Sequence, residues 1–293
     1  MKMQLGVTLI AKAALCANSV LAQAPQGAHM SYLVNPEAKV GVDLSRGGAI
    51  VFLSRGGGDN LINNFDLGRQ VQLSFFSGPV PFAVGDQHPA KQWEHIGWNP
   101  IQAGDDFKHA SRVLEHRNDG HSIYVKTLPL QWPLNNVPGD CTFESWLRLD
   151  GPVVTVRARL NNARLDVKQY PARLQELPAV YANAPYHRVV SYTGDRPFCG
   201  APVRTMTKPT GSHPWSFWYA TEGWSALLDD GDRGIGLLTP GRAKRFSITI
   251  SSMRFATSWW RERCLKFARE PWPLDYRYCL HGRLLRTGRA GAT

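Results

Sequence analysis

The stretch KVGVDLSRGGAIVFLS, residues 39–54, decides the fold class of this chain. Apolar and polar residues alternate on both sides of Arg46-Gly47-Gly48, as they do in half-buried strands. Two adjacent glycines between such runs let the backbone turn sharply. The stretch therefore predicts two short strands joined by a tight turn.

The same alternation recurs along the chain between Gly, Pro and Asn residues, and strong amphipathic helical windows are missing. The best helical candidate, DVKQYPARLQEL at 166–177, is broken by Pro171. We therefore predict an all-β chain: an antiparallel β-sandwich of supersandwich or jelly-roll type with few short helices. The further strand-forming stretches are RQVQLSFFSG (69–78), HSIYVKTLPLQW (121–132), CTFESWLRLDG (141–151), PVVTVRARLNNA (152–163) and the hairpin GWSALLDDGDRGIGLLTPG (223–241).

The first 24 residues are typical of an export signal. Lys2 is followed by an apolar run and then by small residues, so cleavage is expected after Ala22 or Ala24. A lipidated Cys16 is the alternative. No segment offers the ~20 uninterrupted apolar residues of a membrane anchor. We expect a secreted or periplasmic protein with no stable membrane anchor.

The positive charge is concentrated at the C-terminal end. The chain carries 34 Lys and Arg against 23 Asp and Glu, but 12 of the basic residues and three of the acids follow residue 241. The preceding residues are nearly balanced, and no basic-aromatic motif accompanies the charge, which argues against a nucleic-acid partner. We expect a β-sandwich domain over 32–241 and an Arg-rich segment over 242–293, either a closing strand or an aberrant tail.

The sequence lacks the motifs of several common enzyme classes. There is no nucleophile elbow, zinc-protease motif, phosphate-binding loop or dinucleotide fingerprint. The cysteines lack CxxC spacing, so a finger-type zinc site is not expected, although they could pair in an oxidising compartment. We predict no cofactor and no metal; a metal held by distant residues such as His95, Asp105 and His187 is the alternative. The cysteines beyond the expected signal are Cys141, Cys199, Cys264 and Cys279.

Two segments carry side chains that suit a sugar. The loop HIGWNPIQAGDD, residues 95–106, combines an indole with amides and carboxylates, the groups that stack on sugar rings and bind hydroxyls. The strand at 69–78 places glutamines on one face. A core tryptophan, a simple turn and a solvent-facing row are the structural alternatives. The substrate-binding candidates here are Arg69, Gln72, Trp98, Asn99, Gln102 and Asp105.

Two further segments carry acid–base groups. Glu176 lies among apolar neighbours in LQELPAVY, and Glu222 lies among aromatic residues. Two carboxylates that face each other across a cleft can act as proton donor and as base or nucleophile in glycosidic cleavage. The alternative for each is an ordinary surface or capping carboxylate. The catalytic candidates are Glu176, Glu222, His187 and Tyr186, and Tyr181 and Trp224 join the substrate-binding set.

The segments 60–79, 98–106, 176–198 and 221–241 together resemble secreted bacterial carbohydrate-active β-sandwich proteins of the galactose-mutarotase-like or polysaccharide-lyase-like supersandwich type. The resemblance runs from about Val34 to Gly241, and the Arg-rich end departs from it. It implies a sugar ligand in an open groove on a concave sheet. On that resemblance the groove would be lined by Arg69, Asn99, Gln102, Asp105, Glu176, His187 and Glu222.

The leading interpretation is an exported enzyme that cleaves glycosidic bonds in a polysaccharide or oligosaccharide by carboxylate acid–base catalysis. One rival is a polysaccharide lyase, in which Tyr181, Tyr186 or His187 removes a proton from a uronate while Arg69 or Asn99 offsets the carboxylate charge. The other rivals are a non-catalytic carbohydrate-binding protein and a sugar epimerase.

Overall fold

The computed structural model describes residues 29–166, 168–207, 215–239, 244–249, 254–258 and 273–281. The expected export signal and the lipidation alternative at Cys16 lie outside the described residues. Apart from two three-residue 3-10 turns, η1 (Leu44–Arg46) and η2 (Lys91–Trp93), the regular structure of the described part is β-strand. No helix among these residues is long and apolar enough to cross a membrane.

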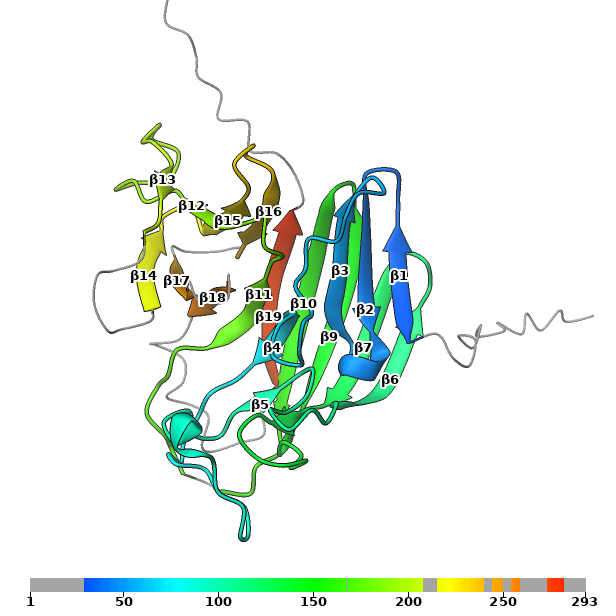
Figure 1. The fold of residues 1–293 in the computed structure, drawn as a ribbon, viewed down its shortest axis with the longest axis vertical. Coiled ribbons are helices and arrows are strands. Elements are labelled where there is room, and N and C mark those ends of the chain that lie inside the picture. Colours follow the sequence, from blue (N-terminus) through cyan, green and yellow to red (C-terminus); the bar gives the residue numbers. More distant parts are fainter. Residues whose placement is uncertain are drawn as a thin grey trace, which may run out of the picture.

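The first sheet has ten strands and contains the N-terminal end of the described chain (blue in Figure 1). Its strands are β1 (Met30–Val34), β2 (Ala38–Asp43), β3 (Ala49–Arg55), β4 (Val71–Ser74), β5 (Pro100–Ile101), β8 (Leu130–Gln131), β11 (Glu176–Tyr181), β14 (Trp215–Ala220), β17 (Lys244–Thr249) and β18 (Arg254–Ser258). The order along the sheet is β1-β2-β3-β4-β11-β18-β17-β14, and β5 joins β4 to β8.

The second sheet has nine strands in the order β13-β12-β15-β16-β19-β10-β9-β7-β6. All of the pairings in both sheets are antiparallel. Its strands are β6 (Arg112–Asn118), β7 (Ser122–Leu128), β9 (Cys141–Asp150), β10 (Val153–Asn162), β12 (Arg188–Ser191), β13 (Arg204–Thr205), β15 (Trp224–Leu228), β16 (Gly234–Leu238) and β19 (Pro273–His281).

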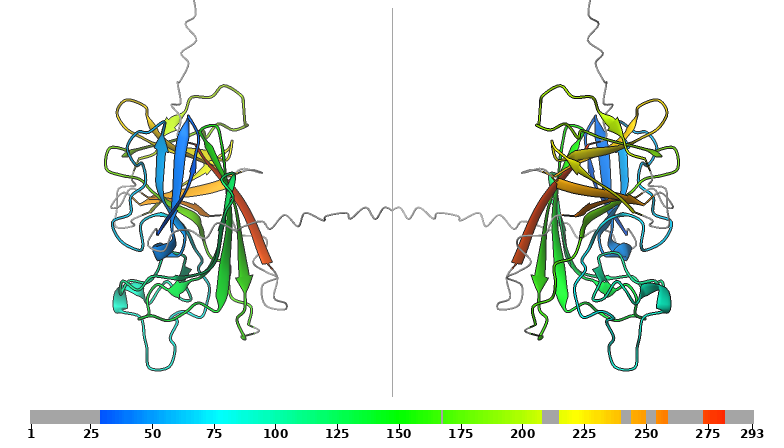
Figure 2. Two further views of the ribbon diagram at one scale, coloured as in Figure 1. Left: turned by 90° about the vertical axis from the view of Figure 1, so that its right-hand side faces the viewer. Right: turned by 90° about the vertical axis from the view of Figure 1, so that its left-hand side faces the viewer.

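The two sheets pack face to face and confirm the predicted β-sandwich. Figure 2 shows β2 and β3 (blue) beside the layer that contains β9, β10 (green) and β19 (red). Val40 and Leu53 from the first layer join Phe143 and Val156 from the second in one core cluster, and each is at most 1% exposed. Burying such a side chain contributes about 1.5–3 kcal/mol. The apolar residues of the alternating patterns form the inward faces of these strands.

The opening stretch forms β2, η1 and β3, as predicted. Gly47 ends η1 in the left-handed region, with φ of 60°, which a residue with a side chain rarely adopts. A Cβ atom built there would lie 1.8 Å from the carbonyl oxygen of Gln102. The turn therefore needs glycine for its conformation and for the close approach of a second loop.

The Arg-rich segment contributes strands to both sheets. β17 and β18 lie between β11 and β14 in the first sheet, and β19 lies between β16 and β10 in the second (Figure 1). β19 pairs with β10 over nine residue pairs, from Val153–His281 to Asn161–Pro273. The last strand of the described residues is thus an interior strand of its sheet rather than an edge.

The cysteines of the described part are free thiols. Cys141 is buried at the start of β9, and Cys199 is exposed. The expected disulfides therefore do not include a bond between these two residues. Cys264 and the side chain of Cys279 lie outside the described residues.

Candidate functional site

A cleft that is open to solvent lies where the end of β4 meets the connection between β10 and β11. We call it the Arg164 cleft. Phe75, Phe76 and Ser77 line one side of it, and Trp98 contributes from the loop predicted to hold a ligand. The side chains that line it from the connection include Arg164, Asp166, Lys168, Tyr170, Arg173 and Gln175.

Arg164 is fixed between two aromatic rings. Its guanidinium carbon lies 4.8 Å from the centroid of the Trp98 ring and 4.9 Å from that of Tyr170. An ion pair of 2.5 Å joins it to Asp166, whose Oδ2 also accepts a hydrogen bond from the Tyr170 hydroxyl (2.6 Å). Only 9% of the Arg164 side chain is exposed. These four groups hold one another in place, so this wall of the cleft is preorganised.

Two long-range contacts anchor the connection to the rest of the cleft. The side-chain oxygen of Gln175 accepts from the backbone N–H of Phe76 (2.6 Å), and its amide nitrogen donates to the Phe76 carbonyl (2.8 Å). Arg173 donates to the carbonyl oxygens of Ile96 (2.6 Å) and His95 (2.7 Å). A segment without regular structure is therefore held on both sides by residues far away in sequence.

The cleft carries more positive than negative charge. Arg164, Lys168 and Arg173 line it together with one carboxylate, Asp166. Burial lowers the pKa of Arg173, because a charged group loses solvation in the protein. Burial raises the pKa of Tyr170, and the hydrogen bond to Asp166 raises it further, so the phenol keeps its proton at neutral pH. The cleft thus presents donors on an aromatic wall.

Trp98 lies in the cleft wall, and its ring is covered by protein. The residue is 1% exposed, its ring packs against Phe75 at 6.0 Å, and Arg164 covers a face. The ring is therefore not open to a stacked sugar in this arrangement, and its role in binding stays a prediction. The indole N–H has no hydrogen-bond partner among the described residues, which leaves a buried donor in the wall.

Four other polar side chains were expected to line an open groove. In the structure they form hydrogen bonds with backbone groups. Each is at most 4% exposed. Gln102 accepts from the N–H of Leu73 (3.1 Å) and donates to the carbonyl oxygen of Gly47 (3.3 Å). Asp105 accepts from the backbone N–H of His109 (2.8 Å), and the His109 ring nitrogen lies 3.0 Å from the other oxygen. Gln72, Asn99, Gln102 and Asp105 are all buried in this way, and their assignment to substrate binding stays a prediction.

β11 carries two of the predicted residues and is buried along its whole length. Glu176 opens the strand next to Gln175 in the cleft wall, is 7% exposed and pairs with Ser74 of β4. Tyr181 closes the strand at 6% exposure, and burial raises the pKa of its phenol. Both faces of a strand inside a covered sheet are out of water, which alternation alone cannot reveal.

Glu222 lies in the turn between β14 and β15, and two strands separate β14 from β11, which carries Glu176. Its two oxygens accept from the backbone N–H of Phe198 (3.0 Å) and from the indole N–H of Trp224 (2.8 Å). Trp224 packs against a small second cluster of apolar residues. Glu222 therefore stabilises this turn together with Trp224. This is the capping role given as the alternative in the sequence analysis.

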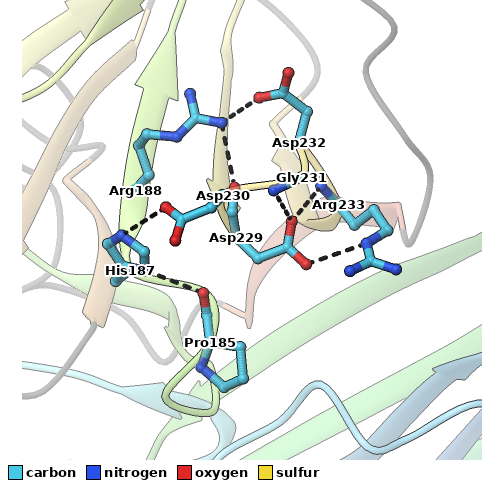
Figure 3. Close-up of polar contacts among 8 residues, drawn as sticks. All are labelled: Pro185, His187, Arg188, Asp229, Asp230, Gly231, Asp232 and Arg233. Atoms are coloured by element: carbon cyan, nitrogen blue, oxygen red, sulfur yellow. Dashed lines mark hydrogen bonds and ion pairs between the residues drawn. The ribbon is translucent and has the colours of Figure 1, made fainter.

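Polar contacts join the hairpin between β15 and β16 to His187 and Arg188 (Figure 3). The His187 Nε2 lies 3.3 Å from an oxygen of Asp230, and its Nδ1 lies 3.1 Å from the carbonyl oxygen of Pro185. Arg188 pairs with Asp232 and donates to the Asp229 carbonyl. These contacts tie the start of β12 to the hairpin, and none of these residues lines the Arg164 cleft.

The two remaining candidates also lie outside the cleft. Tyr186 is half-buried against the main core, and burial, followed by the charge of Asp229, raises its pKa. Arg69 forms an ion pair with Asp66 and lies over the Phe65 ring at 5.4 Å. The assignments of all these residues to catalysis or binding stay predictions. Among the described residues, no group of three His, Cys, Asp or Glu side chains could hold a metal ion.

Sequence reasoning missed the residues of the β10–β11 connection that line the cleft. Their signal is present in ARLDVKQYPAR, residues 163–173, where three basic residues accompany one acid and a tyrosine. Pro171 breaks the helical pattern there, and that pattern alone does not indicate a binding segment. A polar, charged segment that forms neither helix nor strand is the kind of connection that carries binding residues.

No family model matches the chain, and no curated protein matches it in sequence. Similar solved structures include a galactose mutarotase related enzyme from Lactobacillus acidophilus (11% identity, 87% of this chain and 97% of that chain, TM-score 0.46). An alpha-mannosidase from Enterococcus faecalis V583 (10%, 85% and 29%, 0.49) and an alpha-galactosidase from Lactobacillus brevis (8%, 86% and 39%, 0.45) are also similar. Identities and TM-scores this low transfer no reaction and no catalytic residues.

Proposed function

We propose that this protein is an exported carbohydrate-active enzyme that cleaves glycosidic bonds in a polysaccharide, and that it holds the saccharide in the Arg164 cleft. The observation that carries the proposal is the wall in which Trp98, Arg164, Asp166 and Tyr170 fix one another. A rigid wall with donors and aromatic surface is what sugar recognition requires, because sugars present hydroxyls and C–H faces together. Export rests on the apolar, small-residue N-terminal sequence.

The lining of the cleft supports a saccharide ligand, because polar groups and an aromatic ring lie together in an opening to solvent. The half-buried ring of Tyr170 offers an aromatic surface, and Lys168 and the Asn162 side chain add polar groups at its rim. Each of these groups comes from the same connection or from the end of β10, so the ligand would be held mainly by one segment.

Two routes of cleavage compete, and the charge of the cleft favours one of them. Hydrolysis uses two carboxylates on opposite sides of the bond, whereas the cleft contributes Asp166 alone, already engaged by Arg164 and Tyr170. β-Elimination on a uronate instead uses a cation to offset the sugar carboxylate while the C5 proton is removed and the C4–O bond breaks. Lys168 and Arg173 suit that second route.

The reaction is read from the mass of its products. The purified protein is incubated with neutral polysaccharides and with uronate polysaccharides, and the products are weighed by mass spectrometry. Elimination leaves an unsaturated end, and hydrolysis adds one water for each bond broken. Either product supports glycosidic cleavage and decides between the routes. If no polysaccharide yields a product, the enzyme proposal fails and a binding role replaces it.

A further inference from the structure

We infer that the Arg164 cleft recognises the carboxylate of an acidic saccharide through Lys168 and Arg173. The inference rests on the proposed saccharide site and adds to it the chemical class of the ligand. Three observations support it. The cleft has a net positive charge, Arg173 is held by neutral carbonyl groups, and the carboxylate of Asp166 is already bonded to Arg164 and Tyr170.

The charges of the cleft do not cancel. Arg164 and Asp166 pair with each other at 2.5 Å and form a neutral unit. Neither Lys168 nor Arg173 forms an ion pair within the described ranges, although both line the cleft. Two positive charges in one concave site attract an anion, because a cleft walled by protein focuses the field of its charged groups.

Arg173 is held in position by groups that leave its charge uncompensated. Two of its nitrogens donate to the carbonyl oxygens of Ile96 and His95, which are neutral. A guanidinium has five N–H donors, so these two bonds orient the group and leave further donors for a ligand. A fixed guanidinium fork matches the two oxygens of a carboxylate, which adds specificity to the charge attraction.

The carboxylate of Asp166 does not offset this attraction. Its Oδ2 accepts from both Arg164 and the Tyr170 hydroxyl, so its charge is already satisfied. Lys168 is exposed at the rim, where a flexible ammonium can follow a sugar carboxylate without reordering the wall. A neutral saccharide would meet the same aromatic surface but would leave both cations without a partner.

Isothermal titration calorimetry with matched ligands tests the inference. The probes are tetrasaccharides of galacturonate, mannuronate and glucuronate, each compared with its fully methyl-esterified, uncharged form. We expect at least one acid to bind about tenfold more tightly than its ester, as a charge-assisted hydrogen bond predicts. That preference should shrink as sodium chloride rises, because salt screens charges at an open cleft.

Lys168→Gln removes one of the two cations at an exposed position, so the variant is expected to fold. It should reduce the acid-over-ester preference several-fold. Arg55→Gln is the matched control, since Arg55 is exposed at the end of β3, does not line the cleft and loses the same charge. An unchanged preference in Lys168→Gln would overturn the assignment.

The outcomes separate the inference from the proposed function. If every ester binds as tightly as its acid and a neutral polysaccharide is cleaved, the inference is wrong while the proposed enzyme stands. If uronates bind with the expected preference but nothing is cleaved, the inference stands and the proposed reaction is wrong. If no saccharide of either kind binds or is cleaved, both are overturned.

Discussion

The guanidinium of Arg164 lies 4.8 Å above the indole of Trp98, although 66 positions separate the two residues in the chain. The contact joins the β10–β11 connection to the loop after η2 and forms the fixed wall of the cleft. It also explains why Trp98 both belongs to the hydrophobic core and lines the cleft. Its ring is covered by protein while its N–H stays without a partner among the described groups.

Replacing Arg164 by alanine should lower the free energy of unfolding by about 1–3 kcal/mol. The variant loses contacts with two rings and an ion pair whose arginine is largely buried, and it leaves Asp166 without its cation. Urea titration followed by tryptophan fluorescence measures the change. Arg55→Ala is the control, expected within about 0.5 kcal/mol of wild type. Equal effects of the two variants would contradict the stacked arrangement.

Glu222→Gln should affect stability more than activity. The amide keeps one acceptor oxygen and replaces the other by a donor that faces the N–H of either Phe198 or Trp224, which should cost about 1–2 kcal/mol. Cleavage measured as kcat/KM should stay within about threefold of wild type, since the loss of a general acid or base costs about 10²–10⁴-fold. A loss of that size in both Glu222→Gln and Glu176→Gln would instead support the catalytic pair predicted from the sequence.

Gly47→Ala should destabilise the fold strongly. Its Cβ would lie 1.8 Å from the Gln102 carbonyl oxygen, in a backbone conformation that alanine disfavours. We expect a loss of about 3 kcal/mol or more. Gly57→Ala separates the backbone strain from the steric clash, because Gly57 has a positive φ but open space around it. We expect Gly57→Ala to lower the free energy of unfolding by about 1 kcal/mol. The same unfolding midpoint for both variants would argue against the close approach at Gly47.

The β15–β16 hairpin should make stability depend on pH through Asp229. The backbone N–H of Arg233 donates to this carboxylate and lowers its pKa, as do the Arg233 charge and the N–H of Gly231. A lowered pKa stabilises the fold above the unfolded value near about 4 and loses that contribution as the pH falls through the folded pKa. Wild type should therefore exceed Asp229→Asn in unfolding free energy at pH 7, and the difference should shrink as the pH falls below about 4, the unfolded pKa. A gap that is constant with pH would contradict the account.

The strands could be predicted because alternation is a local property of the chain. Residues 39–54 and 223–241 each contain both strands of a hairpin and the glycines of its turn, and both hairpins form as predicted. The order of the strands is a different matter. β11 lies between β4 and β18, and those neighbours are about a hundred and about eighty residues away, so no local pattern could place them.

The site was harder to predict because side-chain chemistry does not reveal burial. Gln72 and Asn99 have the amides that bind sugars, yet the same amides satisfy backbone groups inside a covered sheet. The cleft residues Lys168 and Arg173 lie in a segment whose irregular pattern suggested only a broken helix. What brings them to Trp98 is the set of long-range bonds made by Arg173 and Gln175, which only the folded chain shows.

The most direct test of the central claim compares cleavage by wild type with cleavage by Lys168→Glu and Arg55→Glu. The first change reverses the charge at the rim of the cleft, and the second makes the same change at the end of β3. On a uronate polysaccharide, the account predicts product from wild type and Arg55→Glu and a loss of kcat/KM of about tenfold or more in Lys168→Glu. Full activity of Lys168→Glu, or no product from wild type, would contradict it.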